Sequence, residues 1–200
     1  MIGDGYARWL LVLHTVLAVA AVAAATHLVV WIRPYLRGSF TRGRAVRRFA
    51  IIATTLYAMT FAVGNLVYPT YKVRVKVEYL QNPTAVAEDA MLRLRQRAVV
   101  EARYRGVAAE PPEDRDLAQA IEGLSNRTDK ISRWFDTKEH WVALGLALSI
   151  GCLVMLLAWD PRRDGGAPAP YVFLLAAGAC ATLWLGAIIG IVTSSWRAIG

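Results

Sequence analysis

Cysteine and histidine are scarce in this 200-residue chain, which contains two cysteines and three histidines. Cys152 and Cys180 lie inside long apolar stretches, so the sequence excludes a disulfide-built domain and we expect both thiols to serve as packing residues. The chain also lacks a nucleophile elbow, a phosphate-binding glycine loop, a paired-thiol motif and a metalloprotease helix. Catalysis of the kind found in soluble enzymes is therefore not predicted.

Charged residues are absent from four stretches, two near each end of the chain, which span 10–32, 49–68, 141–159 and 171–193. At about 1.5 Å per helical residue, each is long enough to cross a hydrocarbon core roughly 30 Å thick. The mean hydropathy is +0.36 although 19% of the residues are charged, so apolar and charged residues are strongly segregated. Aromatic residues mark most ends of these stretches, as membrane anchors do; examples are Trp9, Trp31, Trp141, Trp159 and Tyr171. The sequence predicts four transmembrane helices.

The first stretch is interpreted as a membrane helix rather than a cleaved signal peptide, because it is long, lacks a basic leader and continues into an arginine-rich segment. Segment 33–48 contains six arginines and no acidic residue: Arg33, Arg37, Arg42, Arg44, Arg47 and Arg48. Such a segment is typical of a cytoplasmic loop. The insert at 72–138 would then lie outside the cytoplasm, in a chain that spans the inner (plasma) membrane if the cell is bacterial.

Two further sets of basic residues bear on this orientation. Arg162 and Arg163, in the short segment 160–170, fall on the same side as the first loop. Basic residues at both ends of the insert argue the other way, but they are mixed with acids in a segment too long for the rule to be reliable. The net charge of +8 arises largely from 33–48, and it indicates orientation or contact with anionic lipid. No recognition motif accompanies it, so nucleic acid is not an expected partner.

The polar insert begins with an alternating segment and continues with two amphipathic helices. Residues 71–79 alternate apolar and charged side chains, a period typical of a strand, and predict a short extended link or a strand that pairs with another chain. Helices are predicted at 84–105, with apolar Val86, Ala90, Leu94 and Ala98, and at 115–135. The second carries a seam for a partner helix at spacings of three and four: Leu117, Ile121, Leu124, Thr128, Ile131 and Phe135.

These segments together predict an all-α membrane protein, with two helices on each side of an extramembrane helical hairpin. The hairpin could pack on itself and dock a partner protein, lie on the bilayer surface, or dimerise into a four-helix bundle that senses an external signal. The favoured interpretation is a non-enzymatic membrane subunit or accessory protein that docks its partner through this hairpin.

The three histidines all lie in or beside predicted spans, where ionisable residues suggest function. His14 and His140 fall at similar depth on the first and third spans, with Asn65 nearby on the second. Each histidine continues into small residues: Ala18, Ala21 and Ala25 after His14, and Ala143, Ala147 and Gly151 after His140. This pattern suits a b-type haem with two axial histidines, in a small cytochrome passing electrons between quinone and an external acceptor.

Close packing of helices without a cofactor explains the same small residues, so the haem hypothesis is the alternative to the accessory subunit. His27 follows His14 by thirteen residues, which turns its side chain about 140° away on a helix. It is therefore not expected to share a cleft with His14.

A metal site is a further hypothesis, with Asp136, Glu139 and His140 on one helix face and His14 as an additional ligand. The competing interpretation is structural. Asp136 and Glu139 have the spacing of a capping box that opens the third span, with Phe135 as the hydrophobic staple.

Overall fold

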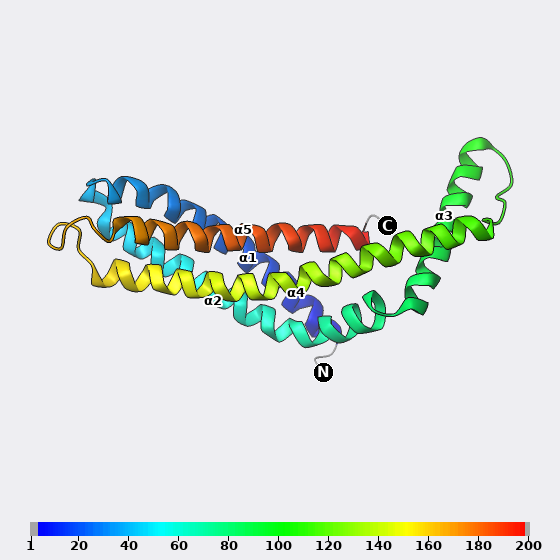
Figure 1. The fold of residues 1–200 in the computed structure, drawn as a ribbon, viewed down its shortest axis with the longest axis horizontal. Coiled ribbons are helices and arrows are strands. Elements are labelled where there is room, and N and C mark those ends of the chain that lie inside the picture. Colours follow the sequence, from blue (N-terminus) through cyan, green and yellow to red (C-terminus); the bar gives the residue numbers. More distant parts are fainter. Residues whose placement is uncertain (1–3, 199–200) are drawn as a thin grey trace. The chain divides into compact units, whose positions relative to one another are not determined.

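The computed structural model describes residues 4–198, and over this range the chain is helical with no strand. Five α-helices follow one another (Figure 1): α1 (Asp4–Leu36), α2 (Gly43–Tyr71), α3 (Pro83–Arg105), α4 (Asp114–Ala158) and α5 (Ala169–Ala198). A short 3₁₀-helix, η1 (Phe40–Arg42), precedes α2, and a π-helix, η2 (Lys72–Leu80), follows it.

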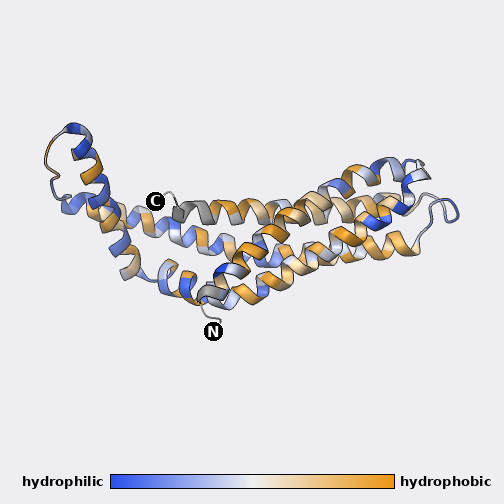
Figure 2. Cartoon of the chain, turned by 180° about the vertical axis from the view of Figure 1, so that it is seen from behind, coloured by the Kyte–Doolittle hydropathy of each residue, from blue (hydrophilic) through white to orange (hydrophobic). Residues whose placement is uncertain are grey.

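Four helical segments are long and apolar enough to cross a membrane: Tyr6–Leu36, Gly43–Leu80, Asp114–Ala158 and Ala169–Val192. This confirms the four apolar helices expected from the charge-free stretches. Figure 2 shows hydrophobic residues along their lengths, with hydrophilic residues concentrated in the connecting segments and around α3. The helices run past the predicted spans, and α1 and α2 continue through Pro34 and Pro69.

Helix α4 joins two elements that were predicted separately, since its 45 residues include both 115–135 and 141–159. No glycine or proline occurs between Phe135 and Trp141, so nothing in the sequence breaks the helix there. The capping-box interpretation of Asp136 and Glu139 is therefore wrong, because no helix begins at these residues.

The chain divides into two compact units. Unit 1 comprises residues 4–68 and Thr137–Val192, and its core takes side chains from α1, α2, α4 and α5. Ile32, Val46, Leu156 and Val172 are fully buried at the end of the unit that carries the arginine-rich loop. The Nη2 atom of Arg47 in this region donates to the carbonyl oxygen of Trp159, at 3.4 Å.

Unit 2 comprises Pro69–Asp136 and residues 193–198, and contains η2, α3 and the first half of α4. Val86 and Ala90 of α3 are buried with Leu124 of α4, so the two helices form a self-packed pair. Of the predicted α4 seam, Leu124 and Thr128 are buried, and Leu117, Ile121, Ile131 and Phe135 are partly buried. Helix α3 begins at Asn82, whose side chain accepts from the backbone N–H groups of Thr84 and Ala85, and ends before Gly106 at φ +68°.

The alternating segment at 71–79 is a helix, which corrects the expectation of an extended link or strand. A lone strand leaves its backbone groups unpaired, whereas a helix pairs them within the segment. The wide π turn, with bonds from residue i to i+5, places Val75, Lys76, Tyr79 and Leu80 on its more buried side. Tyr71 stacks on Phe135 with ring centroids 3.8 Å apart, and Lys76 pairs with Asp136 at 2.5 Å.

Candidate functional site

A line of polar side chains runs through the interior of unit 1 along one face of α2. Thr54, Tyr57 and Thr60 are buried at spacings of three residues, which places them near one another on the helix surface. The Thr54 hydroxyl lies 2.9 Å from the Ser149 hydroxyl of α4, and the Tyr57 hydroxyl lies 3.0 Å from that of Thr182 on α5. Helix α2 therefore makes polar contacts with its neighbours at successive levels.

Tyr57 makes the most constrained of these contacts. Besides meeting Thr182, its hydroxyl donates to the carbonyl oxygen of Val142 on α4, at 3.1 Å. Gly145 of α4 provides the space: a Cβ atom there would lie 1.9 Å from Thr182 Oγ1 and 2.0 Å from Tyr57 Oη. Three helices thus meet where only glycine fits.

His14 of α1 packs against α2 at Thr60 and Gly64, farther from the arginine-rich loop than Tyr57. Its Nδ1 atom is 3.0 Å from the carbonyl oxygen of Thr60, and its ring lies against Gly64, where a Cβ atom would come within 3.0 Å of Cε1. The contact to a carbonyl fixes Nδ1 as the protonated nitrogen of the neutral ring. His14 therefore presents Nε2 as the nitrogen that can accept a bond.

Lys138 of α4 lies against α5. Its Nζ atom is 3.3 Å from the Cβ position of Gly190, and its Cε atom is 4.0 Å from that of Gly186. A long basic side chain thus runs along a glycine-faced part of α5.

The other residues predicted for the haem and metal sites lie in different surroundings. His140 is exposed on α4, and so are Ala143 and Ala147 of its small-residue stripe, whereas Ala21 and Ala25 of the His14 stripe are buried. The two stripes thus differ: one is in the bundle core and the other faces outward.

Asn65 is exposed, and Asp136 forms the ion pair with Lys76. The Oε1 atom of Glu139 is buried and has no hydrogen-bond partner among the described residues. Within residues 4–198, no three His, Cys, Asp or Glu side chains gather closely enough to hold a metal ion. The haem and metal hypotheses stay predictions.

Sequence reasoning overlooked Tyr57, Thr182 and Lys138. The signal for Tyr57 was present, since polar residues recur on α2 at 54, 57 and 60, on a face that continues to Gly64. Lys138 was treated as one of several basic residues flanking the insert. Its distinguishing feature is its alignment with two glycines on another helix, which only the packing reveals.

Unit 2 also exposes large apolar side chains on α3. Large exposed side chains on this helix and just after it are Leu92, Val99, Val100, Tyr104 and Val107, with exposed fractions between 53% and 90%. With about 100° per residue, Leu92 and Val99 lie within about 20° of one another and roughly 120–180° from the buried Val86 and Ala90. Arg95 and Gln96 line a shallow depression with Val99 and Val100. We call these five apolar residues the outer face of α3.

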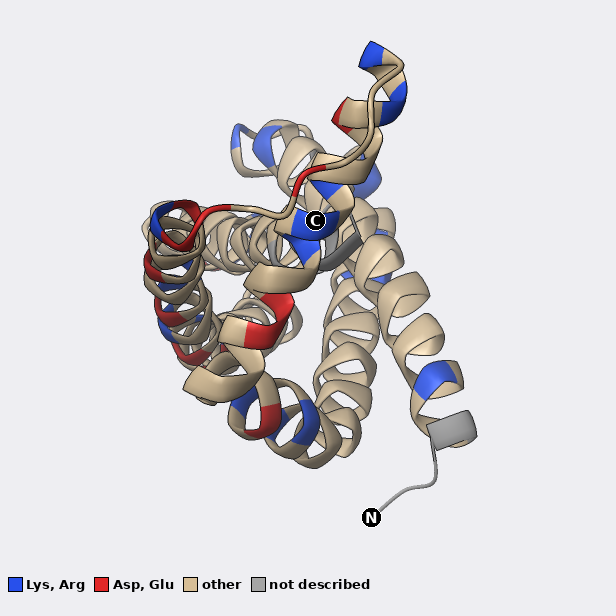
Figure 3. Ribbon diagram, turned by 90° about the vertical axis from the view of Figure 1, so that its right-hand side faces the viewer, with Lys and Arg blue, Asp and Glu red and all other residues tan. Residues whose placement is uncertain are grey.

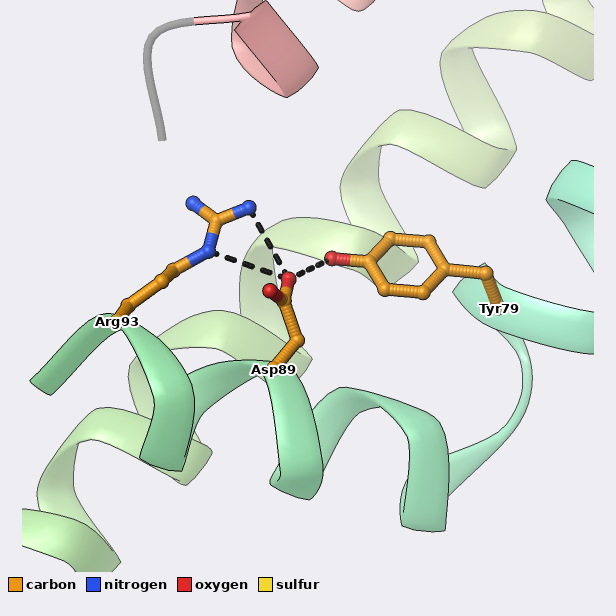
Figure 4. A network of polar contacts seen from close by, with 3 residues as sticks. All are labelled: Tyr79, Asp89 and Arg93. Atoms are coloured by element: carbon orange, nitrogen blue, oxygen red, sulfur yellow. Dashed lines mark hydrogen bonds and ion pairs between the residues drawn. The ribbon is translucent and has the colours of Figure 1, made fainter. Parts of the chain in front are cut away.

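A polar network joins η2 to α3 beside this surface (Figure 4). Asp89 accepts hydrogen bonds from the Tyr79 hydroxyl and from Arg93, whose Nη2 atom is 3.0 Å away. Partial burial lowers the pKa of the Arg93 guanidinium, but the hydrogen bonds and charge of Asp89 outweigh it, so the pKa lies above its usual value. Figure 3 shows that Lys, Arg, Asp and Glu gather in some helical segments, whereas long stretches of other helices carry none.

No protein-family model, curated protein or solved structure matches this chain.

Proposed function

We propose that the chain is a multi-pass integral membrane protein with its arginine-rich loop in the cytoplasm and unit 2 outside. Four helices long and apolar enough to span the bilayer support the membrane placement. Exposed apolar side chains along them, such as Leu13, Ile51, Val154 and Leu174, suit contact with lipid. The six arginines of 33–48 support the orientation.

We further propose that it acts as a non-enzymatic accessory subunit that docks a partner protein through the outer face of α3. The observation that carries this proposal is the exposure of large apolar side chains in a unit rich in charge, with Tyr104 at 90% and Val99 at 56%. Clustered apolar residues with a polar surround mark interaction surfaces on water-facing parts of proteins. Val86 and Ala90 of α3 pack on α4, whereas the residues of the outer face are exposed and available to a partner.

An amphipathic helix with anchors at such spacings fits an apolar groove or helix on another protein. Arg95 and Arg103, both exposed, lie beside the apolar residues and would favour a partner with acidic residues around its groove. Tyrosine and arginine are the residue types that most often dominate binding energy at interfaces.

Photocrosslinking in cells tests the docking proposal. A photoreactive amino acid placed at Leu92 or Val107 of the full chain should yield one discrete protein adduct, whereas the same probe at exposed Gln119 of α4 should yield none. Val99→Glu should abolish the Leu92 adduct without lowering the amount of membrane-inserted protein.

The mass of the adduct separates the alternatives. An adduct with the mass of two copies of this chain would support the dimeric sensor and contradict the accessory-subunit proposal. Adducts only with lipid, or equal adducts from all three positions, would overturn partner docking through α3.

A further inference from the structure

His27 is exposed on the surface of unit 1 although it lies within a charge-free stretch of α1. Its Nδ1 atom is 2.9 Å from the carbonyl oxygen of Ala23, one helical turn earlier. Because a carbonyl oxygen can only accept, Nδ1 is the donor in this bond, and Nε2 is the nitrogen left for another contact. Among the residues that the structure describes, the His27 ring makes no other hydrogen bond.

His27 lies inside the hydrocarbon core if α1 spans the bilayer as proposed. It precedes Ile32, the end of the charge-free stretch 10–32, by five residues, which correspond to about 7.5 Å along a helix. An ionisable side chain that faces lipid at this depth is unfavourable, and such residues mark contacts with other polar groups. Acyl chains carry no hydrogen-bond donor, whereas a second membrane helix can supply one from Ser, Thr, Asn, Gln or Tyr.

The imidazole belongs to a surface that α1 and α2 form together. The His27 ring stacks on Phe49 of α2 with centroids 6.4 Å apart and planes 15° apart, and the Phe49 and Trp31 centroids are 4.8 Å apart. Val30 lies three residues after His27, and Ile52 lies three residues after Phe49; both are exposed. We call these five residues the α1–α2 face.

Basic residues continue the α1–α2 face at its arginine-rich end. The Arg42 guanidinium lies over Trp31, with Cζ 5.7 Å from the ring centroid, and exposed Arg48 lies one turn before Ile52. Segment 33–48 contains no acidic residue to neutralise them. A second copy of the chain would bring the same arginines to a symmetric contact, so like charges oppose self-association here. A partner with acidic residues at this level would instead be complementary.

We propose that the α1–α2 face binds a transmembrane helix of a partner protein, which donates a hydrogen bond to Nε2 of His27 and carries acidic residues near Arg48. The proposal deepens the accessory-subunit function and rests on its membrane placement and orientation. The competing explanation is that His27 is held only by Ala23 and by stacking on Phe49, with lipid around it. That explanation predicts no partner at this surface.

Photocrosslinking in cells tests the surface in the full chain. A photoreactive amino acid at Val30 should yield one discrete adduct with another protein. Val154 of α4 is the matched control position, since it is exposed and lies five residues before Trp159, the end of its own charge-free stretch, and so at equal depth. The probe at Val154 should yield no protein adduct. Peptide mapping should place the Val30 adduct in a transmembrane segment with a donor side chain and with acidic residues just beyond its cytoplasmic end.

Variants in the Val30 probe background test the hydrogen bond. His27→Leu should lower the adduct yield about 3–15-fold, which corresponds to one hydrogen bond between membrane helices. His27→Gln keeps an acceptor and should retain more adduct than His27→Leu. Thr15→Val is the matched control, because Thr15 is also exposed on α1 but its hydroxyl already donates to the carbonyl oxygen of Leu11. It should leave the yield unchanged.

The charge contribution is tested in the same way. Arg48→Gln should lower the Val30 adduct yield, whereas Arg163→Gln, which removes an exposed arginine from the other short loop, should not. Equal losses from the two variants would contradict acidic residues of the partner near Arg48.

Other outcomes would overturn the surface as a whole. These are adducts with lipid alone, a product of two copies of this chain, equal adducts from Val30 and Val154, or a yield that His27→Leu leaves unchanged. Docking through α3 is tested separately by the Leu92 adduct. Loss of the Leu92 adduct alone would contradict docking through α3, and absence of the Val30 adduct alone would contradict the α1–α2 face.

Discussion

Substitution of Gly145 by alanine should be the most damaging single-methyl change in unit 1. The new Cβ atom would lie 1.9 Å from Thr182 Oγ1, 2.0 Å from Tyr57 Oη and 2.7 Å from Thr182 Cβ. These groups cannot move aside without breaking the bonds from Tyr57 to Thr182 and to the carbonyl of Val142. Overpacking of this kind costs about 1–3 kcal/mol, and each hydrogen bond between membrane helices about 0.6–1.7 kcal/mol. With two such bonds at risk, the combined loss is about 2–6 kcal/mol of unfolding free energy.

The loss can be measured as the apparent melting temperature of the purified chain in detergent, read from the fluorescence of size-exclusion fractions. A drop on the order of 5–15 °C is expected for a chain of this length. Gly123→Ala is the matched control in the same helix, because no atom lies within 4 Å of its Cβ position. Alanine there should be neutral or stabilise the helix by up to about 1 kcal/mol.

A double variant separates the steric effect from a general effect on α4. Adding Tyr57→Phe to Gly145→Ala removes one of the clashing oxygens and should recover part of the melting temperature, although Tyr57→Phe alone lowers it by losing two hydrogen bonds. If Gly145→Ala melts at the wild-type temperature, the three-helix contact around Tyr57 is not as tightly packed as described.

Three other predictions concern orientation, unit 2 and the cofactor hypothesis. In a background with Cys152 and Cys180 replaced by alanine, Ala109→Cys should react with a membrane-impermeant maleimide on intact cells and Ser39→Cys only after lysis; the opposite pattern would invert the topology. Asp89→Asn should destabilise the junction of η2 and α3 by about 1–2 kcal/mol, measured as faster hydrogen exchange over residues 72–93. The control is Glu101→Gln, which removes the exposed ion pair between Arg97 and Glu101. Equal exchange rates in the two variants would contradict a special role for Asp89. The chain purified from haem-replete cells should show no sharp haem bands in a reduced-minus-oxidised spectrum; bands abolished by both His14→Ala and His140→Ala would establish the cytochrome hypothesis in place of ours.

The four apolar helices could be predicted because they depend on local patterns. Charge-free length indicated the spans, and the spacing from Leu117 to Phe135 indicated the helix face that packs on α3. Residues 71–79 were misjudged because their alternation predicts a strand, whereas the more buried side of the helix that forms takes Val75, Lys76, Tyr79 and Leu80 and leaves Val73 and Val77 exposed.

The polar interior was harder to foresee because it depends on which helices are neighbours. Gly145 carries no sequence signal until Tyr57 and Thr182 are known to approach it from two other helices. His14 and His140 matched in depth along the chain, but depth does not specify the direction in which each side chain leaves its helix. The structure has His14 against α2, whereas His140 is on an exposed face of α4.

Arg47, like Arg33 over the Phe173 ring and Arg42 over the Trp31 ring, makes a structural contact in addition to contributing charge to its loop. Its side chain donates to the carbonyl of Trp159, just beyond the last residue of α4, where helix carbonyls lack partners and the helix dipole is negative. Arg44 and Arg48 are exposed and are available to act on orientation alone. Reversing the charge at Arg47 would therefore destabilise the end of α4 and also reduce the positive charge proposed to set the orientation, which is the insertion signal. The same change at Arg44 or Arg48 would alter only the insertion signal. If the loop sets the orientation as proposed, the insertion signal can be changed at Arg44 or Arg48 while the end of α4 is left intact, but the end of α4 cannot be changed at Arg47 without also changing that signal.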